Sequence, residues 1–89
     1  MPSRTVTIAS SVGLHARPAA IFVEAVSDSD LDVTIGRPGD DPVDAASILG
    51  VMTLGARHGE TVELTAEGDG ADEVLDALVA LLSRDLDAE

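Results

Sequence analysis

The spacing of apolar residues predicts four short strands along the chain. Near its start, Val6 and Ile8 alternate with Thr5 and Thr7, which is the period of a strand that buries one face. The same alternation returns twice, and the Pro, Gly and Asp residues of RPGDDP are typical of a hairpin turn that leads into a further short strand. The strands are expected at residues 4–9, 31–37, 42–45 and 60–66.

Apolar residues three and four positions apart predict three helices between and after these strands. In the first helix, Ala19, Phe22, Val23 and Val26 form one apolar stripe. The residues SDSD that follow are expected to end this helix at about residue 27. The helices are expected at residues 16–27, 47–55 and 70–86.

The second and third helices carry recognisable signals at their ends. Ser47 is a good N-cap for the second helix, and Gly55 is suited to close it. Asp72 and Glu73 fit the positive end of the third helix dipole. The apolar stripe of the third helix consists of Ala71, Val74, Leu75, Leu78, Leu81 and Leu82.

The order βαββαβα favours an α/β (α+β) domain built as an open-faced sandwich. Three amphipathic helices and a four-stranded sheet can bury their apolar faces together only if the helices cover one face of the sheet. We therefore expect a mostly antiparallel sheet whose other face is wet, within a single domain over residues 1–89. The polar residues expected on the wet face are Thr5, Thr7, Asp32, Thr34, Thr61, Glu63 and Thr65.

Composition restricts the chemistry that this small domain can perform. Of its 89 residues 45% are apolar, but Phe22 is the only aromatic residue, so the core is expected to be aliphatic. The absence of cysteine excludes a disulfide framework, a thiolate nucleophile and a Cys-rich metal site. The sequence shows neither an apolar run of about 18 residues nor a signal peptide. We expect a cytoplasmic monomer without membrane insertion.

The charge of the chain makes some partners unfavourable. Eleven Asp and six Glu residues face five Arg residues and no Lys, which gives a formal net charge of -12. Such a surface repels nucleic acids and anionic lipids, so proteins with basic patches are better partner candidates. The acidic composition is equally consistent with a high net charge that only keeps a small protein soluble.

The loop before the first helix combines residues that could bind and accept a phosphoryl group. Gly13 allows a tight turn, and Pro18 fits the first helical turn, where a missing N–H costs little. The free N–H groups of the helix start form an anion site, and the guanidinium of Arg17 fits phosphate oxygens. The same positive helix end favours a neutral His15, whose free ring nitrogen could attack phosphorus. On this local signal alone, a capping His and a surface Arg are the commoner arrangement.

A resemblance decides between these two interpretations. The stretches GLHARPAAIF at residues 13–22 and DAASILGVMTLGARHGETVEL at residues 44–64 resemble the HPr family of phosphocarriers. This family serves the bacterial phosphoenolpyruvate-dependent sugar phosphotransferase system, and its fold is the same βαββαβα sandwich. The similarity extends over essentially the whole chain, with about one extra residue in the hairpin loop.

The resemblance implies a role for both residues of the loop. In the family, the histidine equivalent to His15 is phosphorylated on Nδ1 by enzyme I, which takes the phosphoryl group from phosphoenolpyruvate. The carrier then passes the group to IIA domains of sugar transporters, and the arginine equivalent to Arg17 neutralises the phosphoryl oxygens. The resemblance thus implies a carrier and not an enzyme, and it requires no cofactor and no metal.

Ser47 and its surroundings allow two interpretations. In some bacteria the equivalent serine is phosphorylated by an ATP-dependent kinase, but the N-cap role alone explains Ser47, and we favour it. Several neighbours depart from the usual pattern: Asp44, Ala46 and Leu49 replace Asn, a basic residue and Met, and Glu24 and Ser27 replace Lys or Arg. The small and apolar residues that could contact partners are Ala16, Ala20, Ile48, Leu49, Met52 and Leu54.

Three further features of the sequence suggest interpretations other than a phosphoryl carrier. His58 has no second histidine or carboxylate at ligand spacing, so we interpret it as a solvated surface residue. Glu24 and Ala46 are consistent with an HPr-like regulatory binding module that does not serve sugar uptake. The stretch DSDL at residues 28–31 suggests an acyl carrier, but Asp30 interrupts the required Asp-Ser-Leu triplet and a strand pattern follows.

Overall fold

Seven elements follow one another in the order that the sequence pattern predicts. The computed structural model describes residues 2–9, 13–14 and 16–84. Within them the order is βαββαβα, as expected. The elements are β1 (Ser3–Thr7), α1 (Ala16–Ser29), β2 (Asp32–Gly36), β3 (Val43–Asp44), α2 (Ile48–Leu54), β4 (Thr61–Glu67) and α3 (Ala71–Leu82).

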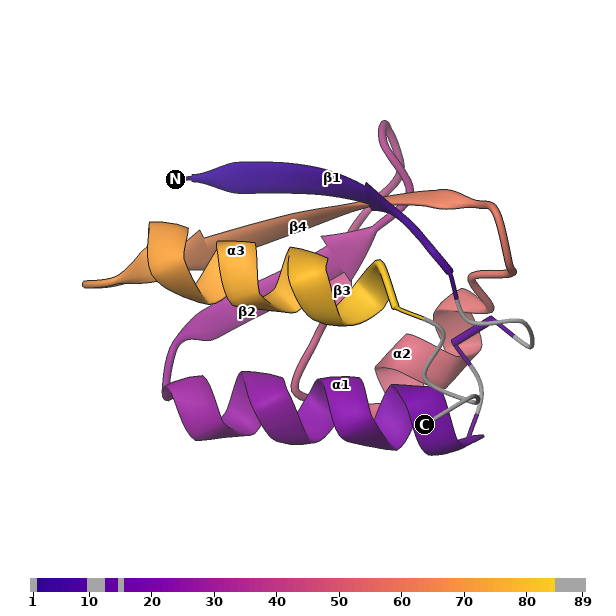
Figure 1. Ribbon diagram of the computed structural model, residues 1–89, viewed down its shortest axis with the longest axis horizontal. Helices are drawn as coiled ribbons and strands as arrows, with labels where there is room; N and C mark the ends of the chain where they lie inside the picture. Colours follow the sequence, from indigo (N-terminus) through magenta and orange to yellow (C-terminus); the bar gives the residue numbers. More distant parts are fainter. Residues whose placement is uncertain (1, 10–12, 15, 85–89) are drawn as a thin grey trace.

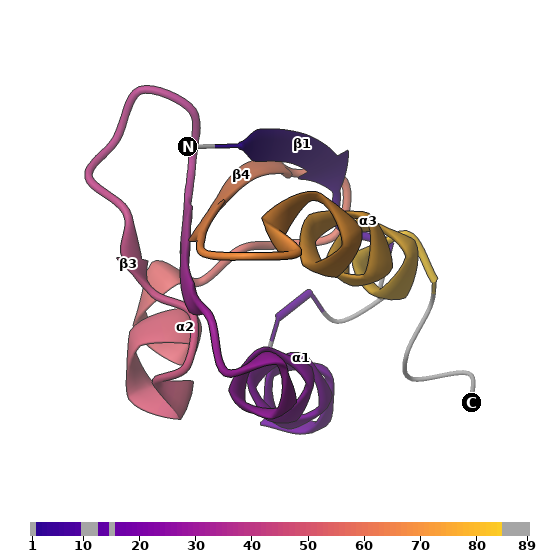
Figure 2. The ribbon, with the colours of Figure 1, turned by 90° about the vertical axis from the view of Figure 1, so that its left-hand side faces the viewer.

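The four strands form one antiparallel sheet in the order β1-β4-β2-β3 (Figure 1). Strand β4 lies in the middle, where Val62 pairs with Val6 of β1 and Leu64 pairs with Ile35 of β2. The hairpin predicted from RPGDDP is present, since β2 pairs with β3, and its loop projects beyond the sheet (Figures 1 and 2). Between β1 and α1, Ile8 and Leu14 form backbone hydrogen bonds with residues 56–60, in the chain between α2 and β4.

All three helices lie on the same side of the sheet, as Figure 2 shows. The covered face of the sheet is apolar, and alternation along β1 and β4 buries Val6, Val62, Leu64 and Ala66 beneath the helices. The opposite face has no helix over it, and its Thr and acidic side chains are exposed or half-buried. The open-faced sandwich is therefore confirmed.

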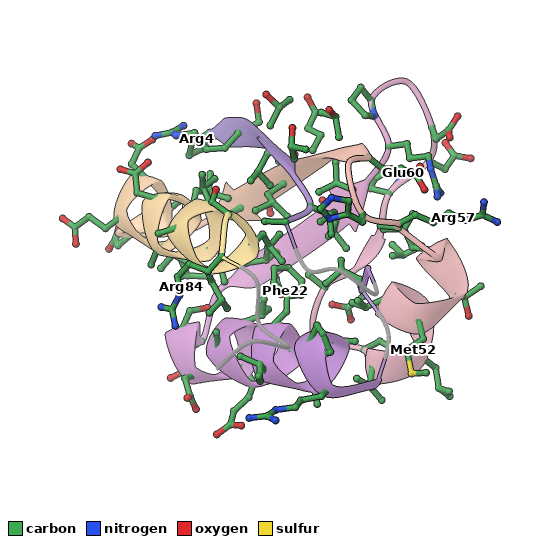
Figure 3. The ribbon with its side chains drawn as sticks, turned by 45° about the vertical axis from the view of Figure 1, so that its right-hand side comes forward. Arg4, Phe22, Met52, Arg57, Glu60 and Arg84 are labelled. Carbon is green, nitrogen blue, oxygen red and sulfur yellow. The ribbon has the colours of Figure 1, made fainter. Side chains whose placement is uncertain are left out.

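The core is aliphatic around a single aromatic ring. Phe22 of α1 is fully buried, together with Leu75 and Leu78 of α3. The labelled ring lies between α1 and the rest of the molecule in Figure 3. Burial of such a side chain contributes about 1.5–3 kcal/mol to folding, so these helices are held mainly by their apolar stripes.

Strands β1 and β3 are shorter than the expected residues 4–9 and 42–45, and two helix ends also differ from the sequence prediction. Helix α1 continues to Ser29, because the Ser29 hydroxyl donates to the Val26 carbonyl at 2.6 Å and accepts from the Leu31 N–H at 3.2 Å. The helix then ends at Asp30, whose positive φ of 59° is tolerated by a short polar side chain. Helix α3 ends at Leu82, earlier than the expected residue 86.

No helix within the described part of the chain is both long enough and apolar enough to cross a membrane.

Candidate functional site

The predicted helix start is present at Ala16, and the two described residues before it are tightly packed. Gly13 has a positive φ of 74°, and Leu14 is fully buried. The Leu14 N–H donates to the Ala56 carbonyl at 2.8 Å. This bond fixes the chain directly before His15, a residue that itself lies outside the described part of the structure.

Arg17 and Pro18 lie in the first turn of α1. Arg17 is exposed, whereas Pro18 is buried. The 14-residue helix has no acidic side chain in its first turn, so the positive end of its dipole is not neutralised locally. Arg17 therefore places a cation at the helix end where an anion is favoured.

Ser47 caps α2 in the predicted way. Its backbone is extended, and its hydroxyl oxygen accepts a hydrogen bond from the Gly50 N–H at 3.1 Å. Immediately before it, the Asp44 carboxylate accepts a hydrogen bond from the Ala46 N–H at 2.9 Å. Two side chains thus stabilise the backbone that enters this short helix.

Helix α2 exposes an apolar surface beside α1. Ile48, Leu49 and Met52 are 37%, 75% and 40% exposed, and we call these three residues the α2 patch. Met52 points outward near the beginning of α1 in Figure 3. Val51, on the same short helix, is fully buried and anchors it to the core.

The other residues expected to contact partners differ in accessibility. Ala20 is exposed on α1, whereas Leu54 is half-buried and packs against the core. Leu54 therefore has less surface to offer a partner than the α2 patch. The side chain of Ala16 lies outside what the structure describes.

Sequence analysis missed an ion pair at this end of the molecule. The Arg37 guanidinium donates to both Glu60 carboxylate oxygens, with Nε to Oε2 at 2.7 Å and Nη2 to Oε1 at 3.1 Å. Together with the Arg57 backbone N–H, which donates to Oε1 at 2.9 Å, Arg37 lowers the pKa of Glu60 to about 2. The two side chains are 23 positions apart, so no local pattern indicates their contact.

His58 and the acidic residues form no metal site within the described residues, where no group of three or more potential ligands lies together. His58 is exposed in the turn before β4. It lines a shallow groove with residues of β1 and the end of α3. Because His15 is not described, the expectation that the site needs no metal stays a prediction.

Comparison with known proteins identifies the family. The sequence matches the family model described as "PTS HPr component phosphorylation site" over residues 2–84. It is 54% identical to the phosphocarrier protein HPr of Haloferax volcanii, over 90% of this chain and 91% of the relative. It is 41% identical to the phosphocarrier protein HPr of Streptomyces coelicolor, over 98% and 94% of the two chains.

A solved structure agrees with this assignment. The crystal structure of an HPr from Thermoanaerobacter tengcongensis is similar to the present fold with a TM-score of 0.91 and 39% sequence identity, over 100% of this chain and 99% of the other. Sequence and fold agree over nearly the full length. The chain therefore belongs to the HPr family of phosphocarriers of the phosphotransferase system.

Proposed function

We propose that this protein carries a phosphoryl group on Nδ1 of His15. Enzyme I would donate the group, having taken it from phosphoenolpyruvate, and IIA domains of sugar transporters would accept it. The proposal rests on the match to the HPr family model. That model is described as "PTS HPr component phosphorylation site", and it matches residues 2–84. The protein would act stoichiometrically in the cytoplasm, so that turnover belongs to its partners and no cofactor is required.

The helix start explains how such a transfer could be stabilised. When a bond forms between Nδ1 and phosphorus, the bond between phosphorus and the donor breaks, and the phosphoryl oxygens keep their negative charge. The exposed guanidinium of Arg17 and the N–H groups at the start of α1 would stabilise that charge. The buried Leu14 and Pro18 would hold the chain on both sides of His15 in place.

Phosphate uptake tests the acceptor. Incubation with enzyme I and phosphoenolpyruvate should add one acid-labile, base-stable phosphate to the wild type and none to His15→Ala. His58→Ala is the matched control, because it removes the other histidine and should be phosphorylated normally. Unchanged uptake by His15→Ala would refute the assignment.

The role of Arg17 predicts slower transfer in a folded protein. Arg17→Ala should lower the transfer rate by about 100-fold, the usual effect of removing one group that stabilises developing charge. The thermal unfolding midpoint should stay close to that of the wild type, since Arg17 is exposed. Arg84→Ala removes another exposed arginine, beyond the end of α3, and serves as the control. Equal transfer rates for Arg17→Ala and Arg84→Ala would contradict the proposal.

The α2 patch, with Ala20, is the proposed docking surface for enzyme I and IIA domains. It combines exposed apolar side chains with a position beside α1. Leu49→Asp should weaken binding of both partners, because a carboxylate would be desolvated on docking. Ala80→Asp adds the same charge on the exposed side of α3 and should leave binding unchanged. If both variants bind like the wild type, docking takes place elsewhere.

For Ser47 we propose a structural role. Its hydroxyl oxygen already accepts the Gly50 N–H, which accounts for its presence without regulation. A serine kinase would be a further partner if the host has one. Treatment of the protein with ATP and an extract of the host, followed by mass spectrometry, tests this, and a phosphate on Ser47 would contradict a purely structural role.

Glu24 and Ala46 favour a second candidate function, an HPr-like regulatory binding module. Both side chains are exposed, at positions where the family often carries basic residues. A reconstituted sugar phosphorylation assay separates the two functions. Sugar phosphorylation at ordinary rates would remove the reason for the alternative.

The proposed carrier is monomeric, because a net charge of -12 opposes self-association. Sedimentation equilibrium should give one 9.1 kDa chain, and twice that mass would contradict this part of the proposal.

A further inference from the structure

One arginine connects the hairpin loop with the end of α2. The Arg37 guanidinium not only binds Glu60 but also donates to the Leu54 carbonyl at 2.8 Å and to the Gly55 carbonyl at 3.3 Å. These carbonyls lie at the C-terminal end of α2, where a cation is favoured by the helix dipole. The planar fork of Arg37 thus binds two different chain segments at once.

The peptide group between Ala56 and Arg57 continues this network toward the candidate site. Its N–H donates to Glu60 Oε1 at 2.9 Å, and its carbonyl accepts from the Leu14 N–H at 2.8 Å. An acceptor on the N–H side of a peptide polarises it and strengthens hydrogen bonds to its carbonyl. The chain of contacts therefore runs from Arg37 to Glu60, through one peptide group, to the residue directly before His15.

Gly13 makes this contact a close one. A Cβ atom built at Gly13 would lie 2.5 Å from the Ala56 oxygen and 2.9 Å from the Arg57 Cα. The loop before α1 therefore rests directly on the peptide group that Glu60 holds. Any rotation of that peptide would move the loop, because no side chain separates the two backbones.

We propose that Arg37 and Glu60 are positioning residues that hold the candidate phosphoryl acceptor loop in register with the α2 patch. The inference rests on the proposed carrier function. Arg37 fixes the end of the helix that carries the patch, and Glu60 fixes the peptide on which the loop rests. One ion pair thus supports both the end of α2 and the peptide that accepts the Leu14 N–H, directly before His15 in the sequence.

A second ion pair supplies a matched control. The Arg4 guanidinium donates to Asp72 at 2.9 Å and to Asp76 at 3.1 Å, and its side chain is 34% exposed, as is that of Arg37. Figure 3 shows Arg4 and Glu60 at opposite ends of the molecule. Loss of Arg4 should therefore resemble loss of Arg37 in its effect on the surface charge but not in its effect on the site.

The first measurement is amide hydrogen exchange of the unphosphorylated protein. In Arg37→Ala and Glu60→Gln, exchange of the Leu14 N–H should become about tenfold faster, because its acceptor peptide is no longer held. The Ala45 N–H, which donates to the Val33 carbonyl in another part of the fold, should keep its rate and thereby exclude a global loss of stability. Arg4→Ala should change neither rate.

The second measurement is the kinetics of phosphoryl transfer from enzyme I. Arg37→Ala and Glu60→Gln should lower kcat on the order of tenfold with little change in KM, because the docking patch persists while the reacting group is misplaced. Arg37→Lys should recover part of the rate, since one ammonium group keeps the charge near Glu60 but cannot bind all four acceptors. Arg4→Ala should transfer like the wild type.

Failure of this inference differs from failure of the proposed function. If the wild type accepts phosphate but Arg37→Ala matches Arg4→Ala in Leu14 exchange and in kcat, the positioning role is wrong while the carrier stands. If KM rises with kcat unchanged, the pair acts on docking alone and the positioning role is also refuted. If the wild type accepts no phosphate from enzyme I, the carrier function itself fails, and the inference that rests on it fails with it.

Discussion

Replacement of Gly13 by alanine is the most direct test of the packing around the candidate site. The residue has a φ of 74°, which an L side chain adopts at a cost of about 1–2 kcal/mol. Its Cβ would also stand 2.5 Å from the Ala56 oxygen, a backbone atom that cannot rotate away. The loop and the peptide after Ala56 must therefore separate.

The loss of stability in Gly13→Ala has two contributions. Besides the backbone cost, the hydrogen bond from the Leu14 N–H to the Ala56 carbonyl is lost or lengthened, at about 1 kcal/mol. Gly13→Ala should therefore destabilise the fold by about 2–3 kcal/mol. In a domain of this size that corresponds to a fall in the unfolding midpoint of about 10–20 °C.

Gly39→Ala separates the two contributions. Gly39 has a similar φ of 88°, but a Cβ there would meet no atom within 4 Å. Its replacement should cost only the backbone term of about 1–2 kcal/mol and lower the midpoint by about 4–16 °C, less than Gly13→Ala does. Thermal unfolding is best followed by far-ultraviolet circular dichroism, because the chain contains no Trp or Tyr. Equal midpoints for the two variants would refute the close approach at Gly13.

Three further changes test other parts of the structure. Ser47→Ala removes the cap of α2 and should destabilise the fold by about 1 kcal/mol, measured by urea unfolding; an unchanged midpoint would contradict the cap. Asp32 lies opposite Glu67 in the sheet, and the two carboxylates repel each other. Asp32→Asn should therefore raise the melting temperature at low salt, and 1 M NaCl should raise the melting temperature of this variant less than that of the wild type. Equal increases in melting temperature would contradict the repulsion. The ion pair with Arg37 lowers the pKa of Glu60 to about 2, so it stabilises the fold above the ordinary pKa of 4.5, and this stabilisation is lost as the pH falls toward 2. The difference in unfolding free energy between the wild type and Glu60→Gln should therefore narrow as the pH falls over this range. A constant difference would contradict the ion pair.

Most of the fold follows from local patterns in the sequence. The alternation of Val6 and Ile8 with threonines, and the stripe through Phe22 and Val26, are sufficient because each element must bury one side against the same core. The start of α1 at Ala16 was also predictable, since Gly13 allows the chain to turn before the helix and Pro18 fits the first helical turn.

What could not be predicted depends on contacts between distant residues or on single local bonds. The extension of α1 to Ser29 rests on one hydroxyl that bonds to Val26 and Leu31, where the sequence alone indicates a helix break. Similarly, the burial of Val51 but not of Met52 follows from how the seven-residue helix α2 packs on the core, which spacing alone does not determine.

The residues expected to perform the chemistry are recognisable from the sequence, but their support is not. Gly13 and Arg17 belong to a short motif, whereas Arg37 and Glu60 belong to two loops that the sheet order brings together. The supporting contacts need only reach the same backbone, so different sequences can supply them from different loops. The chain contains five arginines and seventeen acidic residues, so an ion pair alone does not distinguish Arg37. What distinguishes it is its geometry, because its guanidinium binds Glu60 and the carbonyls of Leu54 and Gly55 at once.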